Sequence, residues 1–174
     1  MKKTWLCLAV AALAVTTSAK EYKLATDWTF RGRQMDSSVS VGPFSPESPQ
    51  QLLTLTAVRN DGWLTLRQTP VAVSSLPKIP EGKKLVITLV YRQKMENVSG
   101  RAFATLEFYD NNAQRIWFYD DKPLNGSADW SDRSVKRTLT AIPEGARWFG
   151  VSFHLGKSSG KVEFLNPRLD ISIQ

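Results

Sequence analysis

The stretches Ile79-Pro80-Glu81-Gly82 and Ile142-Pro143-Glu144-Gly145 carry the same four residues, and each introduces a run of alternating apolar residues. Leu85 to Arg92 follows the first copy, and Trp148 to Leu155 follows the second. Because proline cannot donate to a ladder hydrogen bond and glycine completes a turn, both copies are typical of the position just before a strand. The repeated turn and strand predict an all-β fold, a two-sheet antiparallel β-sandwich or jelly roll.

Further strands and turns are expected along the rest of the chain, and no stretch shows a helical apolar period over helical length. Two polar turns between alternating runs predict hairpins, one joining Leu53–Val58 to Trp63–Arg67 and one joining Phe103–Tyr109 to Arg115–Tyr119. Turns are also expected at Ser99-Gly100 and Ser158-Ser159-Gly160. The remaining expected elements are a strand at Val135–Leu139, a strand at Lys161–Phe164 that pairs back through the turn before it, a closing edge strand at Leu169–Ile173, and loops at Pro43–Pro49 and Asp120–Asp132.

The first nineteen residues have the pattern of a secretory signal peptide. Lys2-Lys3 form a basic region, Leu6 to Val15 an apolar core too short for a membrane span, and Thr17-Ser18-Ala19 a small-residue cleavage site. The single cysteine, Cys7, lies inside this leader, so the mature chain has no disulfide. We therefore expect a bacterial periplasmic or secreted protein with no transmembrane segment after cleavage; an uncleaved anchor is the alternative.

Residues 20–174 are expected to form a single β-sandwich domain, because this length suits one sizeable core. The protein is also expected to be a monomer. The sequence has a net charge of +7, of which the leader lysines contribute two. Lysines and arginines are dispersed, whereas a protein that binds nucleic acid usually clusters them on one face. We therefore predict no nucleic-acid partner.

Strand alternation predicts which side chains face outward. Leu85, Ile87, Leu89 and Tyr91 are expected in the core, as are the alternate apolar residues of the later strands, including Ile116 and Phe118. The predicted outward set consists of aromatic and charged residues: Arg92, Glu107, Arg115, Trp117, Tyr119 and His154, with Trp63 as a further member. Such a set suits a sugar, whose apolar face stacks on aromatic rings while its hydroxyls bond to charged side chains.

From about Leu76 onward, this order of features resembles the galactose-binding-like jelly-roll carbohydrate-binding modules that are often appended to xylanases and cellulases. The resemblance rests on the strand Leu85–Arg92, Leu106–Asp110 with its polar turn, Trp130, Ile142–Ala146, and the hairpin Gly160–Phe164. That family commonly ends with an aromatic residue followed by two aspartates, one of which helps to hold a structural calcium. Here Leu165-Asn166-Pro167 follows Phe164 without a carboxylate, so no cofactor is predicted and calcium is left open.

The resemblance and the outward set together predict a non-catalytic module that binds a polysaccharide or other glycan on a concave face, in a groove around Trp117, Tyr119, Arg92 and Glu107. The alternative is a structural or protein-interaction β-sandwich of the bacterial envelope, in which the aromatic side chains pack together and Arg92 pairs with Glu107. Catalysis is disfavoured because the mature chain lacks cysteine, a nucleophile elbow and a second histidine. A glycan-active enzyme would instead need two carboxylates in one cleft.

Overall fold

The computed structural model describes residues 20–22, 27–32 and 37–174, and the predicted leader lies outside them. All strand pairs in this part are antiparallel. The described elements are β1 Lys20–Tyr22, β2 Trp28–Gly32, β3 Ser38–Pro43, β4 Gln51–Ala57, β5 Trp63–Gln68, β6 Val71–Ala72, the 3₁₀ turn η1 Val73–Ser75, β7 Leu85–Tyr109, β8 Arg115–Asp120, β9 Leu124–Leu139, β10 Trp148–Gly156 and β11 Gly160–Ile173. Within the described residues no helix is long and apolar enough to span a membrane.

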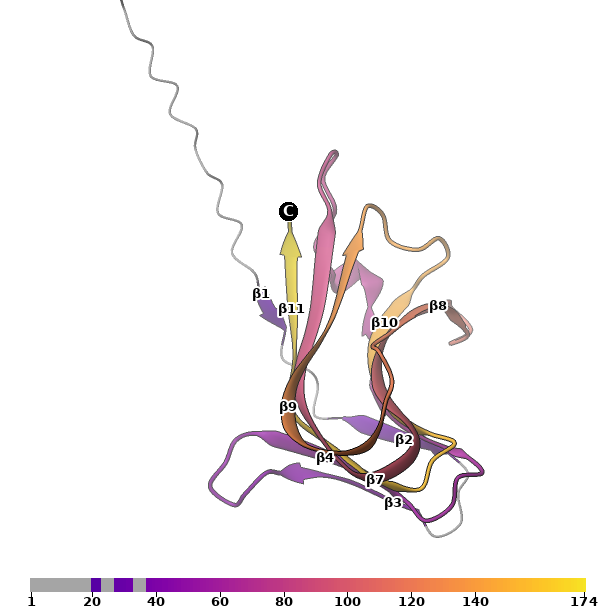
Figure 1. Cartoon of the computed structure of the whole chain (residues 1–174). Helices are drawn as coiled ribbons and strands as arrows, with labels where there is room; N and C mark the ends of the chain where they lie inside the picture. Colours follow the sequence, from indigo (N-terminus) through magenta and orange to yellow (C-terminus); the bar gives the residue numbers. More distant parts are fainter. Residues whose placement is uncertain (1–19, 23–26, 33–36) are drawn as a thin grey trace, which may run out of the picture.

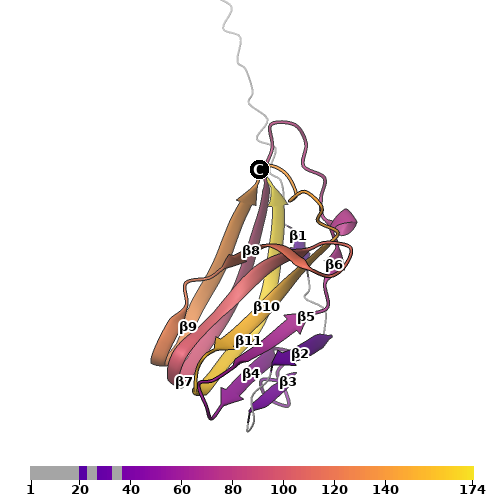
Figure 2. The ribbon, with the colours of Figure 1, turned by 90° about the vertical axis from the view of Figure 1, so that its right-hand side faces the viewer.

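The strands form two layers that share the long, bent strand β7 (Figure 1). Its first half pairs with β9 and β11, and β11 continues to β4 and β3. Its second half pairs with β8 and β10, and β10 continues to β5 and β2, which lie side by side in Figure 2. The predicted all-β sandwich is therefore confirmed.

The core lies between the two layers and follows the predicted alternation. The inward residues of β7 and β10, such as Leu85, Ile87 and Val151, are fully buried. Phe153 of one layer packs against Phe164 of the other with ring centroids 4.6 Å apart, and Tyr91 meets Phe153 edge-on at 5.3 Å. Because burying a large apolar side chain contributes about 1.5–3 kcal/mol, this aromatic cluster is a main source of the attraction between the layers.

Three predicted connections are wrong, each because the chain crosses between layers. Ser99-Gly100 is not a turn but the bend of β7, where a side chain at Gly100 would lie 2.2 Å from the Lys157 carbonyl oxygen. β4 and β5 are not a hairpin, since β4 pairs with β11 and β5 with β10. β11 likewise does not pair with β10; it pairs with β7 and β4, and its second half also pairs with β1 rather than forming an edge.

The segment predicted as the loop Asp120–Asp132 is mostly strand, because β9 begins at Leu124. It pairs with β7 along its length and has no second partner strand among the described residues. Most side chains of this edge strand are exposed, and Lys136 and Arg137 belong to this exposed set. A polar edge strand discourages association with another sheet. Because such a strand has the polar composition of a loop, the sequence pattern predicted a loop here. The hairpin between β7 and β8 is confirmed.

Candidate functional site

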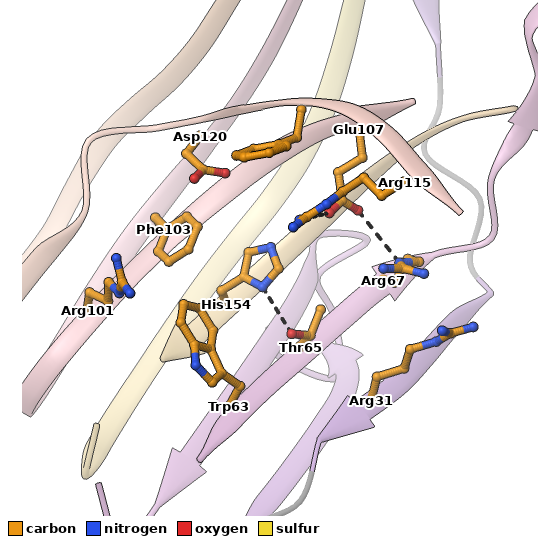
Figure 3. Close-up of a pocket in the computed structure, with 11 residues that line it drawn as sticks. Arg31, Trp63, Thr65, Arg67, Arg101, Phe103, Glu107, Arg115, Asp120 and His154 are labelled. Carbon is orange, nitrogen blue, oxygen red and sulfur yellow. Dashed lines mark hydrogen bonds and ion pairs between the residues drawn. The ribbon is translucent and has the colours of Figure 1, made fainter. Parts of the chain in front are cut away.

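The outer face of the layer formed by β8, β7, β10, β5 and β2 carries a groove of about 550 Å³, hereafter the central groove (Figure 3). Its walls combine four arginines, two carboxylates and several aromatic rings. The lining residues are Arg31, Trp63, Thr65, Arg67, Arg101, Phe103, Glu107, Arg115, Phe118, Asp120 and His154.

Strand register places these side chains in rows across the layer. His154 of β10 lies between Thr65 of β5 and Phe103 of β7. The neighbouring row runs from Arg67 through Ser152 and Thr105 to Asp120. Because every second residue of a strand faces the same side, each row presents all its side chains away from the core.

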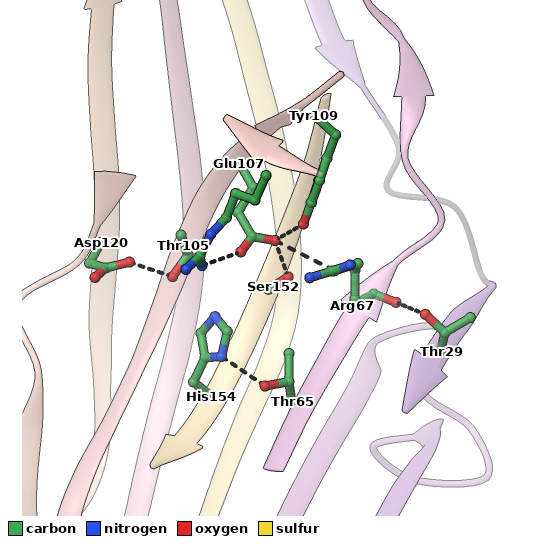
Figure 4. Close-up of polar contacts among 10 residues, drawn as sticks. Thr29, Thr65, Arg67, Thr105, Glu107, Tyr109, Asp120, Ser152 and His154 are labelled. Atoms are coloured by element: carbon green, nitrogen blue, oxygen red, sulfur yellow. Dashed lines mark hydrogen bonds and ion pairs between the residues drawn. The ribbon is translucent and has the colours of Figure 1, made fainter. Parts of the chain in front are cut away.

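Glu107 is a fully buried carboxylate on this outward face (Figure 4). It accepts hydrogen bonds from the Tyr109 hydroxyl, from the Ser152 hydroxyl at 2.5 Å and from Arg115 Nη1 at 2.9 Å. Arg67 Nε lies 3.6 Å from the same carboxylate. Burial alone would raise the pKa of Glu107, but the hydrogen bonds from Ser152, Tyr109 and Arg115 outweigh it, and the pKa lies below its ordinary value.

His154 lines the groove and is itself only 6% exposed. Its Nδ1 lies 3.0 Å from the Thr65 hydroxyl, and its Nε2 has no hydrogen-bond partner within the described part of the chain. The imidazole stacks on Phe103 at 4.7 Å. Burial lowers the pKa of His154 to about 4; Glu107 opposes this shift, and Arg115 and Arg67 add to it. The ring is therefore neutral at pH 7.

Two aromatic rings flank this polar centre. Trp63 lies against Gly156, where an added Cβ would come within 2.5 Å of the indole, and it meets Phe103 edge-on. The Arg101 guanidinium lies 4.9 Å from the centre of the Trp63 ring. At the opposite wall Phe118 is half exposed, with the Arg115 guanidinium 4.4 Å from its ring centre. The groove thus offers both apolar rings and charged hydrogen-bond donors.

The structure brings together four of the seven predicted site residues: Trp63, Glu107, Arg115 and His154 all line the central groove. Glu107 and His154 face outward from the core as predicted, yet both are buried. The reason is that long neighbouring side chains, above all Arg67 and Arg115, cover the outward face of the sheet.

The predicted faces of Ile116, Trp117 and Phe118 are reversed, whereas Arg115 lines the central groove as predicted and Tyr119 is 38% exposed. The register between β7 and β8 shifts between Phe108 and Tyr109, so alternation does not continue from Arg115 to Trp117. Ile116 and Phe118 were expected in the core but are 42% and 50% exposed. Trp117 instead packs against the core at 5.4 Å from Phe108, and the Arg137 guanidinium lies 4.9 Å from the centre of the Tyr119 ring. Because the four residues from Ile116 to Tyr119 are all apolar or aromatic, the alternation of polar and apolar residues does not indicate which face is buried. In the structure the large indole of Trp117 covers the edge of the core. Trp117 and Tyr119 do not line the central groove.

Arg92 lies in a different place, on the first half of β7. It forms an ion pair with Asp132 at 3.5 Å and approaches the Trp130 ring at 5.8 Å. Arg92 therefore does not form the predicted ion pair with Glu107, whose partners are Arg67 and Arg115. The predictions missed Arg31, Thr65, Arg67, Arg101, Phe103, Phe118 and Asp120. Thr65 and Arg67 stand two and four residues after Trp63, and Phe103 stands four residues before Glu107. Side chains at these spacings on one strand face the same side, so strand alternation would have predicted them from Trp63 and Glu107.

The residues after Phe164 do not suit the structural calcium that the resemblance implies. Asn166 lines a small cavity together with Arg92, Arg168 and Asp132. Two guanidinium groups beside a single carboxylate repel a hard cation. In the described residues no group of three or more His, Cys, Asp or Glu side chains is placed to hold a metal ion.

Comparison with known proteins establishes similarity of fold. No protein-family model matches the sequence, and no curated protein matches it. The family 11 carbohydrate-binding module from Clostridium thermocellum, in complex with a β-1,3-1,4-mixed-linked tetrasaccharide, is similar with a TM-score of 0.53 and 13% identity, over 87% of this chain and 94% of that one.

Two enzymes contain a region of similar fold. The enzymatically active domain of bacteriophage CBA120 tailspike protein 4 is similar with a TM-score of 0.55 and 15% identity over 82% of this chain, which spans about a fifth (19%) of the tailspike domain. A Stig cyclase from Fischerella sp. TAU is similar with a TM-score of 0.50 and 15% identity, over 91% of each chain. The predicted carbohydrate-binding-module type of jelly roll is confirmed as a fold, and function has to be argued from the groove.

Proposed function

We propose that this protein is a non-catalytic, exported carbohydrate-binding module that holds a glycan in the central groove. The observation that carries the proposal is the pairing of aromatic rings with fixed charged donors in one groove, with Trp63 and Phe118 on opposite walls and Arg101 and Arg115 beside them. A pyranose ring needs both, because its apolar face stacks and its hydroxyls form hydrogen bonds.

The same fold in a module that holds a tetrasaccharide supports this proposal, since it shows that this architecture accommodates an oligosaccharide. Each stacked ring contributes on the order of 1–2 kcal/mol. Two rings and a few hydrogen bonds, less the cost of association, correspond to a Kd from roughly millimolar to micromolar. Export to the periplasm or the medium follows from the leader-like residues 1–19 and belongs to the proposal.

Glu107 is unsuited to be the acid or nucleophile of a glycoside hydrolase. Its carboxylate is fully buried, and one of its oxygens accepts from both Tyr109 and Ser152 while the other accepts from Arg115. Its pKa is held below the ordinary value, whereas a general acid needs a raised pKa. We therefore assign Glu107 the role of positioning Arg115 and Arg67.

Affinity electrophoresis and isothermal calorimetry against a broad panel of neutral and acidic polysaccharides test the proposal. Trp63→Ala is expected to weaken binding about 5- to 30-fold, corresponding to the loss of one stacked ring. Trp130→Ala is the matched control, because this indole packs on Phe44 outside the central groove. If the folded protein binds none of the polysaccharides, the proposal is wrong; if Trp63→Ala binds as tightly as the wild type, the assigned groove is wrong.

A second candidate, a glycan-cleaving enzyme that uses Asp120, is favoured by one observation: this carboxylate, unlike Glu107, is exposed at the central groove. Asp120 accepts a hydrogen bond from Thr105 at 2.8 Å, whereas Asp121 turns to the other side and accepts from Tyr91. Release of reducing ends from any polysaccharide in the panel, abolished by Asp120→Asn, would establish this second function in place of the first.

A further inference from the structure

The positive charge of the central groove exceeds its negative charge. Four arginines line it against two carboxylates, and His154 adds no charge at pH 7 because burial lowers its pKa to about 4. Arg67 and Arg115 are both engaged with Glu107. Arg31 and Arg101 are exposed and form no ion pair with any residue that the structure describes. Among the described residues, the groove therefore has two guanidinium groups with no acid of their own.

We infer that the ligand of the central groove is an acidic polysaccharide whose sugar units carry carboxylates. This inference rests on the proposed glycan binding and narrows its ligand class. A guanidinium matches a carboxylate with two parallel hydrogen bonds, which are stronger than those it makes to neutral hydroxyls. Arg31 and Arg101 are the residues that meet the ligand carboxylates.

His154 gives an independent observation that a ligand with an oxygen acceptor binds in this groove. Its Nε2 is buried and unpaired within the described residues, and Figure 3 shows it directed toward the side of the groove where Arg115 lies. A buried polar atom without a partner costs about 1–3 kcal/mol, so a ligand that supplies one is favoured. When the Thr65 hydroxyl donates to Nδ1, Nε2 carries the proton and donates to a ligand oxygen.

A second groove of about 360 Å³ continues the first, and Arg31 and Arg67 line both. Trp148, which is 40% exposed, lies at the wall of this second groove. A chain that crosses both grooves therefore meets Trp63 in one and Trp148 in the other, with Arg31 where the grooves meet. This arrangement suits a polymer with repeated acidic units better than a single sugar.

The experiment compares polymers that differ in charge but share a backbone, by calorimetry in 150 mM NaCl. Two pairs share a backbone: polygalacturonate with its methyl-esterified form, and glucuronoxylan with the corresponding neutral xylan. Alginate, mixed-linkage β-glucan and dextran sulfate, a polyanion without carboxylates, are further probes. We expect at least one of the acidic polymers to bind about tenfold or more tightly than its neutral counterpart. Arg31→Gln and Arg101→Gln should each reduce a tenfold preference by about threefold, because the two guanidinium groups share it.

Lys136→Gln is the matched control, because it removes one exposed charge from β9 in the other layer. If Lys136→Gln weakens acidic binding as much as Arg31→Gln, or if dextran sulfate binds as tightly as the polyuronates, the attraction is general and the inference is overturned. If neutral polymers bind as tightly as acidic ones, the inference falls while the proposed glycan binding stands. If no polymer binds, both fall.

Discussion

Acidification is expected to destabilise this protein through His154, the only histidine of the chain. The imidazole is 6% exposed, stacked on Phe103, and lies beside the Thr65 hydroxyl. Burial disfavours the charged imidazolium and lowers the pKa of His154 from 6.5 to about 4. The unfolded chain, whose imidazole is in water, therefore takes up the proton at a higher pH than the folded chain does.

The sign and size of the effect follow from proton linkage. The folded pKa is below the unfolded one, so the full contribution of the neutral imidazole to stability is present above pH 6.5 and is lost as the pH falls toward 4. Each unit of pKa difference corresponds to 1.36 kcal/mol, which gives a loss of about 3 kcal/mol across this range. Such a loss is a large fraction of the typical stability of a domain.

Two measurements check this prediction. An NMR titration of the single imidazole should give a pKa near 4 in the folded protein. Urea denaturation between pH 7.5 and 4 should show a free energy of unfolding that falls in the wild type and falls by about 3 kcal/mol less in His154→Gln. A folded-state pKa near 6.5, or parallel pH dependence in the two proteins, would refute the reasoning.

Two further substitutions test the polar and aromatic parts of the groove. Glu107→Gln should lower the free energy of unfolding by about 2–4 kcal/mol at pH 7, as measured by urea denaturation, because it leaves buried donors and Arg67 without a charged acceptor. Because the pKa of Glu107 is lowered in the folded protein, its contribution to stability is lost on acidification, so the difference in free energy of unfolding between wild type and Glu107→Gln should shrink below pH 4.5. Asp132→Asn is the control: it removes an exposed carboxylate and should leave the free energy of unfolding unchanged. Gly156→Ala should displace Trp63, shift its fluorescence and weaken glycan binding, whereas Gly42→Ala, which meets no atom within 4 Å, should do neither.

The positions of the strands and of the core could be predicted because one face of each central strand is mainly apolar. Leu85, Ile87 and Leu89 occupy alternate positions of β7, and all three are fully buried. The pairing of the strands could not be predicted in the same way. The Asn60-Asp61-Gly62 turn is typical of a hairpin, but the same turn also suits an arch that joins two layers, as it does between β4 and β5.

The candidate site was predicted in part, for a related reason. Alternation placed Trp63, Glu107 and His154 on the outward face, and they do share the central groove. It failed on β8, where Ile116 to Tyr119 are all apolar or aromatic, so that only packing against Phe108 decides which side is buried. It also could not tell that Arg92 lies in the first half of β7, before the bend that carries the second half into the other layer.

The burial of polar groups on the outward face bears on how the groove recognises a ligand. Thr105, Glu107 and Ser152 are fully buried although they point away from the core. What covers them is a layer of arginine side chains held by Glu107 and by neighbouring rings, such as Arg67 at 4.7 Å from the centre of the Tyr109 ring. Because these side chains are already ordered, a ligand does not have to immobilise them, and less of its interaction energy is spent on ordering the site. Such a groove distinguishes ligands by where their charged groups meet the fixed arginines. Because Glu107 holds these arginines, substitutions at Glu107 should alter the selectivity between acidic and neutral glycans as well as the stability of the protein.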